Sequence, residues 1–366
     1  MTLIFTSYAS AAGYNQPGEW LKRIEGYTGI LEALSSKHNV IGIERINYEG
    51  QMIQNGVQYF FIRLKRRVVY FPRRLHGMIQ QLQPDVVFIN GFIFPLQIIQ
   101  LRLKFGRRIK IIILHRGEKP YTGWRILLQR WADKCINGYL FTSAAFGAAW
   151  TKHGNISDQR KIFEVIQASS IFYPSDKHAA KSLLGITGSI NFLWIGRLDA
   201  NKDPLTVVKA FIQFLSFQPR ATLHMIYQEE GLLHEVNKMI LSNDVAPAAI
   251  KLVGAIPHQQ LQDWFNAADF IISGSHHEGS GVAVCEAMSC GCIPVLTDII
   301  SFRKMTGPGK CGLLYEPGNE KALLQALINT VGLNRAEESQ KTMQQFKEEL
   351  SFEAIAKKID HIITAG

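Results

Sequence analysis

The sequence predicts an α/β protein made of two Rossmann-like domains, each built on a parallel sheet. Its 366 residues suffice for two domains of about 150 residues each. Apolar residues make up 47% of the chain and charged residues 19%, which excludes a mostly disordered protein. Short apolar runs alternate with amphipathic stretches in two successive series, as strands and helices do in a parallel α/β fold.

The two series of strand-like runs define the two expected domains. The first series consists of Leu3–Phe5, Asn39–Ile43, Asp85–Ile89, Lys110–Leu114, Gly138–Phe141 and Ile162–Ile166. The second consists of Asn191–Ile195, Thr222–Tyr227, Ile250–Val253, Asp269–Ile272 and Ile293–Leu296. We therefore expect one domain over residues 1–170 and another over residues 190–346, with their sheets facing across a cleft.

A linker and a terminal helix complete this expected organisation. Residues 171–189 contain Pro174, Gly185 and Gly188, and we place the hinge there. Within residues 347–366, the stretch Phe352–Ile363 has the apolar spacing of a helix. We expect this helix to pack back toward the N-terminal domain.

Composition excludes several classes of protein. No window contains the roughly 18 consecutive apolar residues that a membrane-spanning helix needs. Residues 1–7 lack the positive charge and the apolar length of a signal peptide, so we expect a buried first strand and a cytoplasmic location. The five cysteines are scattered and odd in number, without Cys-x-x-Cys pairs or companion histidines. We expect neither a disulfide framework nor a metal site.

The net charge of +10 is concentrated in the first half of the chain. Residues 1–180 carry 24 Lys and Arg against 11 Asp and Glu, whereas residues 181–366 carry 16 against 19. The basic residues gather in two stretches that contain no acid and are interleaved with bulky apolar residues: Arg63, Lys65, Arg66, Arg67, Arg73 and Arg74, then Arg102, Lys104, Arg107 and Arg108. This pattern is typical of a surface that docks on an anionic bilayer, and a solvated helical face is the alternative. Nucleic acid is not expected, because no known nucleic-acid-binding motif accompanies the charge.

Because ligands of open α/β sheets bind beyond the carboxyl ends of the strands, we expect ligand-binding and catalytic residues there. The run Asn191–Ile195 is followed by Gly196, Arg197 and Lys202, and then by Asp203 and Pro204, which are typical of a helix start. Two cations beside a helix N-terminus indicate a phosphate or diphosphate clamp. Two surface cations on a loop are the alternative interpretation.

A second candidate site follows the run Asp269–Ile272. A glycine-rich turn, residues 279–282, leads into a short helix that Gly291 ends. Glu278 precedes the turn and Glu286 lies in the helix, so two carboxylates that can accept hydrogen bonds from sugar hydroxyls bracket one edge. A capping or surface role is the alternative for each. His115, directly after Lys110–Leu114, is a third candidate because of its place at a strand end.

These residues resemble a known pattern. Glu278 and Glu286, with seven residues between them, followed by Ala287, Met288, Gly291 and Pro294, resemble the E-x7-E motif of retaining GT-B glycosyltransferases of family 4. Gly196-Arg197 with Lys202, and Val253-Gly254, extend the resemblance over most of residues 190–330. The first half resembles the family less, through Pro84–Val87 and His115-Arg116-Gly117.

The resemblance implies a role for each of these residues. Arg197 and Lys202 would neutralise the diphosphate of the donor, Glu286 would hold the ribose hydroxyls and Glu278 the donor sugar. Val253 would lie near the base, and His115 would face the sugar from the other domain. Gly196 would form part of the donor site, where it lets the backbone turn tightly. Main-chain amides of the glycine-rich turn would contact sugar and phosphates; this turn comprises Gly279, Ser280, Gly281, Val282 and Ala283. No metal or other cofactor is expected, since the family lacks an Asp-x-Asp metal motif and so does this chain.

The function implied is a retaining glycosyltransferase that moves a sugar from a nucleoside-diphosphate sugar to an acceptor. We hypothesise a lipid-linked or surface-glycan acceptor at the inner membrane face, because of the basic stretches. Departures from the family include Ser280, where phenylalanine is common, and the first loop, Ser7–Gly13, which lacks several glycines. The alternatives are a GT-B phosphorylase or epimerase, a glycoside hydrolase with paired carboxylates, or a non-catalytic protein that binds anionic lipid or nucleic acid.

Overall fold

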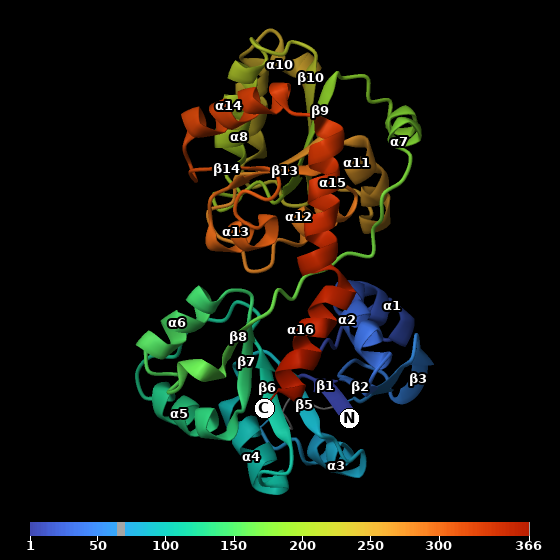
Figure 1. Ribbon diagram of the computed structural model, residues 1–366, viewed down its shortest axis with the longest axis vertical. Helices are drawn as coiled ribbons and strands as arrows, with labels where there is room; N and C mark the ends of the chain where they lie inside the picture. Colours follow the sequence, from blue (N-terminus) through green and yellow to red (C-terminus); the bar gives the residue numbers. More distant parts are fainter. Residues whose placement is uncertain (64–69, 366) are drawn as a thin grey trace. The chain divides into compact units, whose positions relative to one another are not determined.

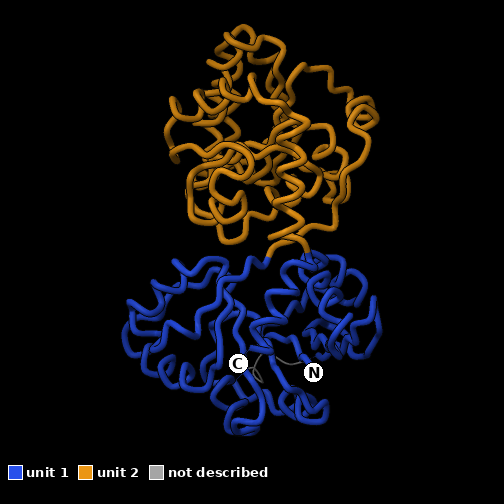
Figure 2. Tube along the Cα trace, in the orientation of Figure 1, with its two compact units in different colours: residues 1–167, 352–366 blue, residues 168–351 orange. Residues whose placement is uncertain are grey.

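The computed structural model describes residues 1–63 and 70–365, which form two compact units. Unit 1 comprises residues 1–167 and 352–366, and unit 2 comprises residues 168–351 (Figure 2). The chain therefore leaves unit 1, builds unit 2 and returns to unit 1 for its last helix. In the part of the chain described, no helix is long and apolar enough to cross a membrane.

Unit 1 is built on an eight-stranded sheet with the order β3-β4-β2-β1-β5-β6-β7-β8. Its strands are β1 (Thr2–Thr6), β2 (Asn39–Glu44), β3 (Gly50–Gln54), β4 (Val57–Phe61), β5 (Val86–Asn90), β6 (Lys110–Leu114), β7 (Gly138–Phe141) and β8 (Ile162–Glu164). All neighbours are parallel except β3 and β4. The six strands expected from the sequence are confirmed.

The antiparallel β3–β4 hairpin was not predicted. Its two-residue turn is Asn55-Gly56, and both residues have positive φ, 48° and 81°. Such a turn matches the right-handed twist of a hairpin, and Asn-Gly is its most favourable sequence. The hairpin adds an edge to the otherwise parallel sheet.

Helices cover both faces of the unit 1 sheet (Figure 1). They are α1 (Pro17–Arg23), α2 (Glu25–Ser35), α3 (Arg73–Gln81), α4 (Pro95–Phe105), α5 (Arg125–Cys135), α6 (Ala144–Lys152) and α16 (Phe352–Thr364). Apolar residues of α1, α2 and α16 pack on one face, and those of α3, α4, α5 and α6 on the other. Alternate residues of β1 follow the same division, since Ile4 faces one cluster and Leu3 and Phe5 the other.

The C-terminal helix α16 belongs to the core of unit 1. Its buried residues Ile355, Ile359 and Ile363 join the cluster formed with α2. The ring of Phe352 lies where α2 has Gly29, so close that any Cβ there would lie 2.6 Å from the ring. The sequence-based expectation of a helix at residues 352–363 is confirmed.

Unit 2 has a fully parallel sheet with the order β11-β10-β9-β12-β13-β14. The strands are β9 (Ile190–Gly196), β10 (Ala221–Tyr227), β11 (Ile250–Gly254), β12 (Phe270–Ser273), β13 (Ile293–Thr297) and β14 (Leu313–Tyr315). The five expected strands are present, and β14 adds a sixth. The helices are α7 (Lys177–Leu184), α8 (Pro204–Phe214), α9 (Leu233–Leu241), α10 (Ala246–Ala249), α11 (Leu261–Ala267), α12 (Val282–Ser289), α13 (Ile300–Thr306), α14 (Glu320–Asn329) and α15 (Arg335–Gln345).

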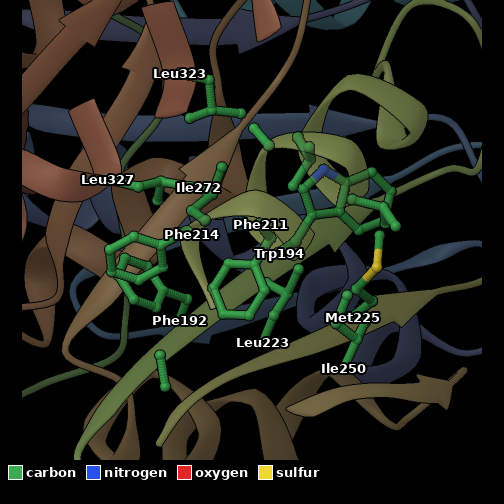
Figure 3. Packing of buried hydrophobic residues seen from close by; sticks show 14 of the residues in the cluster. Phe192, Trp194, Phe211, Phe214, Leu223, Met225, Ile250, Ile272, Leu323 and Leu327 are labelled. Atoms are coloured by element: carbon green, nitrogen blue, oxygen red, sulfur yellow. The ribbon is translucent and has the colours of Figure 1, made fainter. Parts of the chain in front are cut away.

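Aromatic side chains fill the core between the unit 2 sheet and α8 (Figure 3). Phe192 on β9 stacks on Phe270 of β12, with ring centroids 5.0 Å apart. Phe211 and Phe214 of α8 meet Phe192 edge-on, at 5.5 and 5.7 Å. This packing fixes β9 against α8, and the loop that joins these two elements carries the predicted cations.

Residues 171–189, which we expected to form a linker, belong to unit 2. The chain enters unit 2 at Ala168, and α7 packs on α11 inside this unit. Burial alone would raise the pKa of the Asp269 carboxyl, but ion pairs with Lys177 at 2.8 Å and with Lys181 at 3.7 Å hold that pKa below its usual value. These ion pairs, invisible in local composition, tie the segment to unit 2.

Candidate active site

The carboxyl end of β9 positions the predicted cations. Gly196 is the last residue of β9. A Cβ at this position would lie 3.1 Å from the ring of Trp194. Asp203 then caps α8, since its carboxylate accepts a hydrogen bond from the main-chain N–H of Thr206. Pro204 is the first residue of the helix, as predicted. Arg197 and Lys202 thus lie between a central strand and a capped helix.

A cavity of about 410 Å³ opens beside this loop, within unit 2. Its lining combines an apolar part with a polar part that includes both predicted cations. The apolar part includes Ile195, Ile226, Tyr227, Ile256, Leu261 and Ile271, and the polar part includes Arg197, Lys202, Gln228, His258, Glu278 and Ser280. A cavity with a few convergent polar groups on an apolar wall is typical of a small-molecule site.

Lys202 and Glu278 form an ion pair in the cavity wall. The Lys202 ammonium contacts Oε1 of Glu278, and the two side chains are 21% and 15% exposed. The Ser275 hydroxyl donates to the same carboxylate oxygen at 3.0 Å. The predicted clamp cation and the predicted sugar-binding carboxylate are therefore direct neighbours.

Asn201 joins the two loops that carry this pair. Its side-chain amide donates to the carbonyl of His277 at 3.1 Å and accepts from the main-chain N–H of His277 at 3.1 Å. The main-chain N–H of His276 donates to the carbonyl of Asn201 at 2.8 Å. These bonds fix the loop of Lys202 against the loop of Glu278. The sequence alone does not predict them.

Arg197 lies at the cavity with a more exposed side chain. Its guanidinium pairs with Asp199 at 3.1 Å, and the side chain is 52% exposed. An exposed ion pair of this kind contributes little stability. The guanidinium can therefore exchange Asp199 for a ligand anion at small cost.

The glycine-rich turn and the start of α12 form another side of the cavity. Ser280, Gly281, Val282 and Ala283 line it, whereas Gly279 and Val253 do not. Gly281 has a φ of 57°, and a Cβ there would lie 2.9 Å from the sulfur of Met305. Glycine is thus required where the chain enters the helix, and the first main-chain amides of α12 border the cavity.

Glu286 lies one turn further along α12 and is buried. Its Oε1 lies 2.7 Å from Nε2 of His258, whose side chain lines the cavity. The ring of Phe172 packs beside His258 with centroids 5.0 Å apart. His258 was missed because its partner is 28 positions away; only the turn residue Pro257 before it hinted at a strand-end position.

The thiols near Glu286 have no nucleophilic character. Cys285, Cys290 and Cys292 are free and buried. Burial raises the pKa of Cys290 to about 12 and raises those of Cys285 and Cys292 further. They remain protonated at neutral pH and serve the core.

His115 lies in unit 1, at the end of β6, and is 8% exposed. Its Nδ1 accepts from the main-chain N–H of Gly117 at 3.3 Å, which leaves Nε2 to donate to the carbonyl of Glu118 at 2.9 Å. Burial lowers the pKa of His115, so the ring is neutral at neutral pH. Both ring nitrogens are used by the loop that His115 begins.

Some side chains of the basic stretches make hydrogen bonds or ion pairs within unit 1, and others are exposed. The guanidinium of Arg102 donates to the carbonyls of Cys135 and Ile109 and thereby ties the ends of α4 and α5 together. Arg74 pairs with Glu49 at 2.7 Å. Arg63, Arg73, Lys104, Arg107 and Arg108 are exposed, and Lys65, Arg66 and Arg67 lie outside the described residues. Among described residues, no group of three or more His, Cys, Asp or Glu could hold a metal ion.

Comparison with known proteins shows which family part of this chain is similar to. Residues 177–350 match the family model of glycosyl transferases group 1. The match lies wholly inside unit 2, where the cavity is. Unit 2 is thus the part of the chain that is similar to this family.

Curated relatives match over parts of their length. The chain is 27% identical over 239 residues to the lipopolysaccharide core biosynthesis mannosyltransferase LpsB of Rhizobium meliloti, covering 62% of this chain and 64% of the relative. It is 25% identical over 217 residues to a D-inositol 3-phosphate glycosyltransferase of Paenarthrobacter aurescens, covering 57% and 52%. The matches thus span less than two thirds of either relative.

Solved structures share the whole two-domain α/β fold. A glycosyltransferase from Rickettsia africae has a TM-score of 0.75 at 14% identity, over 100% of this chain and 98% of the other. HepE from Anabaena, solved in complex with UDP, has a TM-score of 0.72 at 13% identity, over 100% of both chains. The GT-B fold expected from the sequence is confirmed by these likenesses.

Proposed function

We propose that the protein is a retaining glycosyltransferase that transfers a sugar from a nucleoside-diphosphate sugar to an acceptor hydroxyl. The observation that carries this proposal is the pairing of Lys202 with Glu278 at a cavity that Arg197 and the start of α12 also line. Cations, helix amides and a carboxylate are the groups that a diphosphate and a sugar require. The group 1 match over unit 2 supports the same activity.

Donor binding would exchange the partners of the ion pair. Lys202 would turn from Glu278 to the diphosphate, and Arg197 would leave Asp199 for the same group. Glu278, still held by Ser275, would then accept hydrogen bonds from hydroxyls of the donor sugar. Positive charge fixed beside the departing diphosphate stabilises the negative charge that develops there, so we expect no metal requirement.

The chemical step follows from the groups available. The bond between the anomeric carbon and the diphosphate oxygen breaks while the acceptor oxygen bonds to that carbon on the same face. The acceptor proton passes to the departing diphosphate. Burial of the thiols beside Glu286 keeps them protonated, which supports a route without a cysteine nucleophile.

The donor nucleoside would occupy the apolar part of the cavity. Glu286 would accept hydrogen bonds from the ribose hydroxyls, and His258 would hold its carboxylate in place at 2.7 Å. Ile226 and Leu261 offer an apolar wall for the base. Val253 would contribute through the packing beneath this wall.

Turnover with a panel of nucleoside-diphosphate sugars tests the activity. With a competent donor, the wild type is expected to release the nucleoside diphosphate in the presence of EDTA, and NMR of the product is expected to show a retained anomeric configuration. Arg197→Ala and Lys202→Ala should each lower kcat/KM by about a hundredfold, whereas Lys209→Ala, on the exposed face of α8, should not. Full activity in both clamp variants would refute the clamp.

We further propose that unit 1 docks on an anionic membrane, where a lipid-linked or glycan acceptor is presented. The support is an exposed set of apolar side chains on α4, on α5 and directly before α5, two helices that pack together: Leu103, Trp124 and Trp131 are 79, 75 and 67% exposed. Lys104, Arg107 and Arg108 lie exposed in the same part of the chain. Exposed tryptophans with basic neighbours are typical of surfaces that bind the lipid interface.

Flotation with vesicles of phosphatidylglycerol and phosphatidylcholine tests this docking. The wild type is expected to float with these vesicles and not with pure phosphatidylcholine. Trp131→Glu should abolish flotation, and Phe217→Glu, an equally polar change at an exposed site of unit 2, should not. Equal flotation of all three proteins, or none, would contradict the proposal.

A further inference from the structure

Arg45 is a buried cation whose charge is balanced by no side chain among the described residues. The residue is 4% exposed, and its Nε and Nη2 have no hydrogen-bond partner. Its Nη1 donates to the carbonyl of Tyr8. Burial lowers the pKa of the Arg45 guanidinium, and none of the described carboxylates pairs with it. The adjacent Glu44 accepts instead from the Trp20 indole N–H at 2.9 Å.

Such an arrangement is costly unless a ligand completes it. A buried guanidinium must be paired and hydrogen-bonded to offset its loss of hydration. Buried polar groups without partners are rare in folded proteins, and an unseen ion or ligand is a common reason for them. The partly buried Arg102 of unit 1, by contrast, uses its Nε, Nη1 and Nη2 on carbonyls and an amide oxygen.

Arg45 also lies where an α/β sheet binds ligands. It directly follows β2, at the carboxyl end of the strand, and reaches the residue Tyr8 beyond β1. The strand order reverses between β1 and β5, and Ser7 bridges the ends of these two strands by donating to the carbonyl of Asn90 at 3.0 Å. The crevice at such a switch point is the general ligand site of open α/β sheets.

The two free donors define the chemistry of the ligand. Nε and Nη2 lie on one edge of the guanidinium and point in parallel, so they match two oxygens of one phosphoryl or carboxylate group. The loop that follows Tyr8 and lies next to Arg45 consists of small residues, Ala9 to Gly13, most of them exposed. The N–H of Ala11 donates to the Arg45 carbonyl at 2.8 Å. A short exposed loop of this kind can move aside to admit an oxyanion.

We propose that Arg45 anchors an oxyanion-binding site in unit 1 that binds a phosphoryl or carboxylate group in a two-pronged contact with its free edge. The site goes beyond the proposed function, because it shares no residue with the cavity of unit 2. The anion completes the hydrogen bonding of Arg45 and balances its charge.

Thermal unfolding in chloride buffer, with inorganic phosphate, acetate or no added anion at constant ionic strength, tests the site. The Arg197→Ala/Lys202→Ala background removes the cations of unit 2 that also attract phosphate. In this background we expect phosphate at about a hundred times its Kd to raise the melting temperature by about 5 °C or more. Arg45→Met should abolish the shift, Arg45→Lys should reduce it, and Arg73→Met, at an exposed arginine, should preserve it.

The melting temperature without added anion distinguishes ligand binding from a structural role of Arg45. Without added anion, Arg45→Met is expected to melt at the same temperature as its parent or higher, because it removes an unbalanced buried charge. Melting well below the parent in that buffer would overturn the proposal, as would a phosphate shift that persists in Arg45→Met or is absent from the parent.

A phosphorylated ligand is distinguished from the free ion by a further pair of probes. D-inositol 3-phosphate is compared with inorganic phosphate, with free inositol as the neutral control. A larger Arg45-dependent shift with the phosphoester would assign the site to a phosphorylated substrate, and an equal shift to the free ion. Both results support the site, and neither depends on glycosyl transfer.

Discussion

At the scale of single residues, the cations of the cavity form ion pairs with neighbouring carboxylates, and a donor must replace these partners. Lys202 contacts Glu278 and Arg197 contacts Asp199, so no charge in the proposed clamp is left unbalanced before the donor arrives. Because the diphosphate takes both cations, it also frees the carboxylate that is to receive the sugar. Binding of the diphosphate and binding of the sugar are therefore coupled through one ion pair.

His258 is expected to contribute to nucleotide affinity through Glu286. The His258 side chain is half-exposed, so its removal costs about 1–2 kcal/mol, and His258→Ala should weaken binding of the preferred nucleoside diphosphate about five- to thirtyfold. Isothermal titration calorimetry measures this effect, with the exposed His234→Ala on α9 as the control. Equal affinities of the two variants would show that His258 has no such role.

His76 makes unit 1 sensitive to acid. The ring is buried, with Nε2 2.8 Å from the Tyr8 hydroxyl, and burial lowers its pKa to about 4. The unfolded chain binds a proton below about pH 6.5 while the folded ring does not, so stability is complete above that pH and falls as the pH drops toward 4. The loss at pH 4 is about 3 kcal/mol.

The measurement is urea unfolding of the wild type and of His76→Gln between pH 7 and pH 4. The variant is less stable at pH 7, because Tyr8 loses a buried partner, but its stability should fall less steeply with acid. His224 in unit 2, with a pKa that burial also lowers to about 4, remains in both proteins as an internal reference. Parallel curves for the two proteins would contradict the account.

At the scale of elements, most strands of both sheets were predictable because parallel strands that are buried on both faces read as continuous apolar runs, whereas the short, half-buried β14 was not. The hairpin β3–β4 has exposed residues on β3 and was missed, although Asn55-Gly56 is a strong turn signal. Gly196, Arg197, Lys202 and Glu278 were predicted and lie together. Asn201 and His258 were not, because their partners lie 76 and 28 positions away along the chain.

The start of β14 depends on a glycine. Gly312 has a φ of 68°, and a Cβ there would lie 2.3 Å from the Pro294 carbonyl oxygen on the neighbouring β13. Gly312→Ala must strain the chain and push two strands apart, and we expect a loss of about 3 kcal/mol or more. Gly309→Ala has a similar φ of 75° but open space around it, so it should cost only about 1 kcal/mol. Chemical denaturation of both variants tests this, and equal losses would refute the clash.

At the scale of the whole molecule, each unit has its own sheet and its own core. The two units also carry different candidate functional residues. The cavity, lined by the clamp cations and Glu278, belongs to unit 2, as does Glu286, which does not line the cavity itself but contacts the lining residue His258. Unit 1 carries His115, the exposed surface of α4 and α5, and Arg45. That residues 171–189 belong to unit 2 was not predictable from their Pro and Gly content, since the contacts of α7 with α11 place them there.

The central claim is that the cavity of unit 2 binds a nucleoside diphosphate through Arg197, Lys202 and Glu286. The most direct measurement is calorimetric titration of the wild type with UDP, GDP and ADP, repeated with Lys202→Ala, Glu286→Gln and the control Lys209→Ala. We predict that one nucleotide binds, that the first two variants weaken it at least tenfold, about 1.4 kcal/mol, and that the control does not. If none of the three nucleotides binds, or if one binds equally well to all four proteins, the account is wrong.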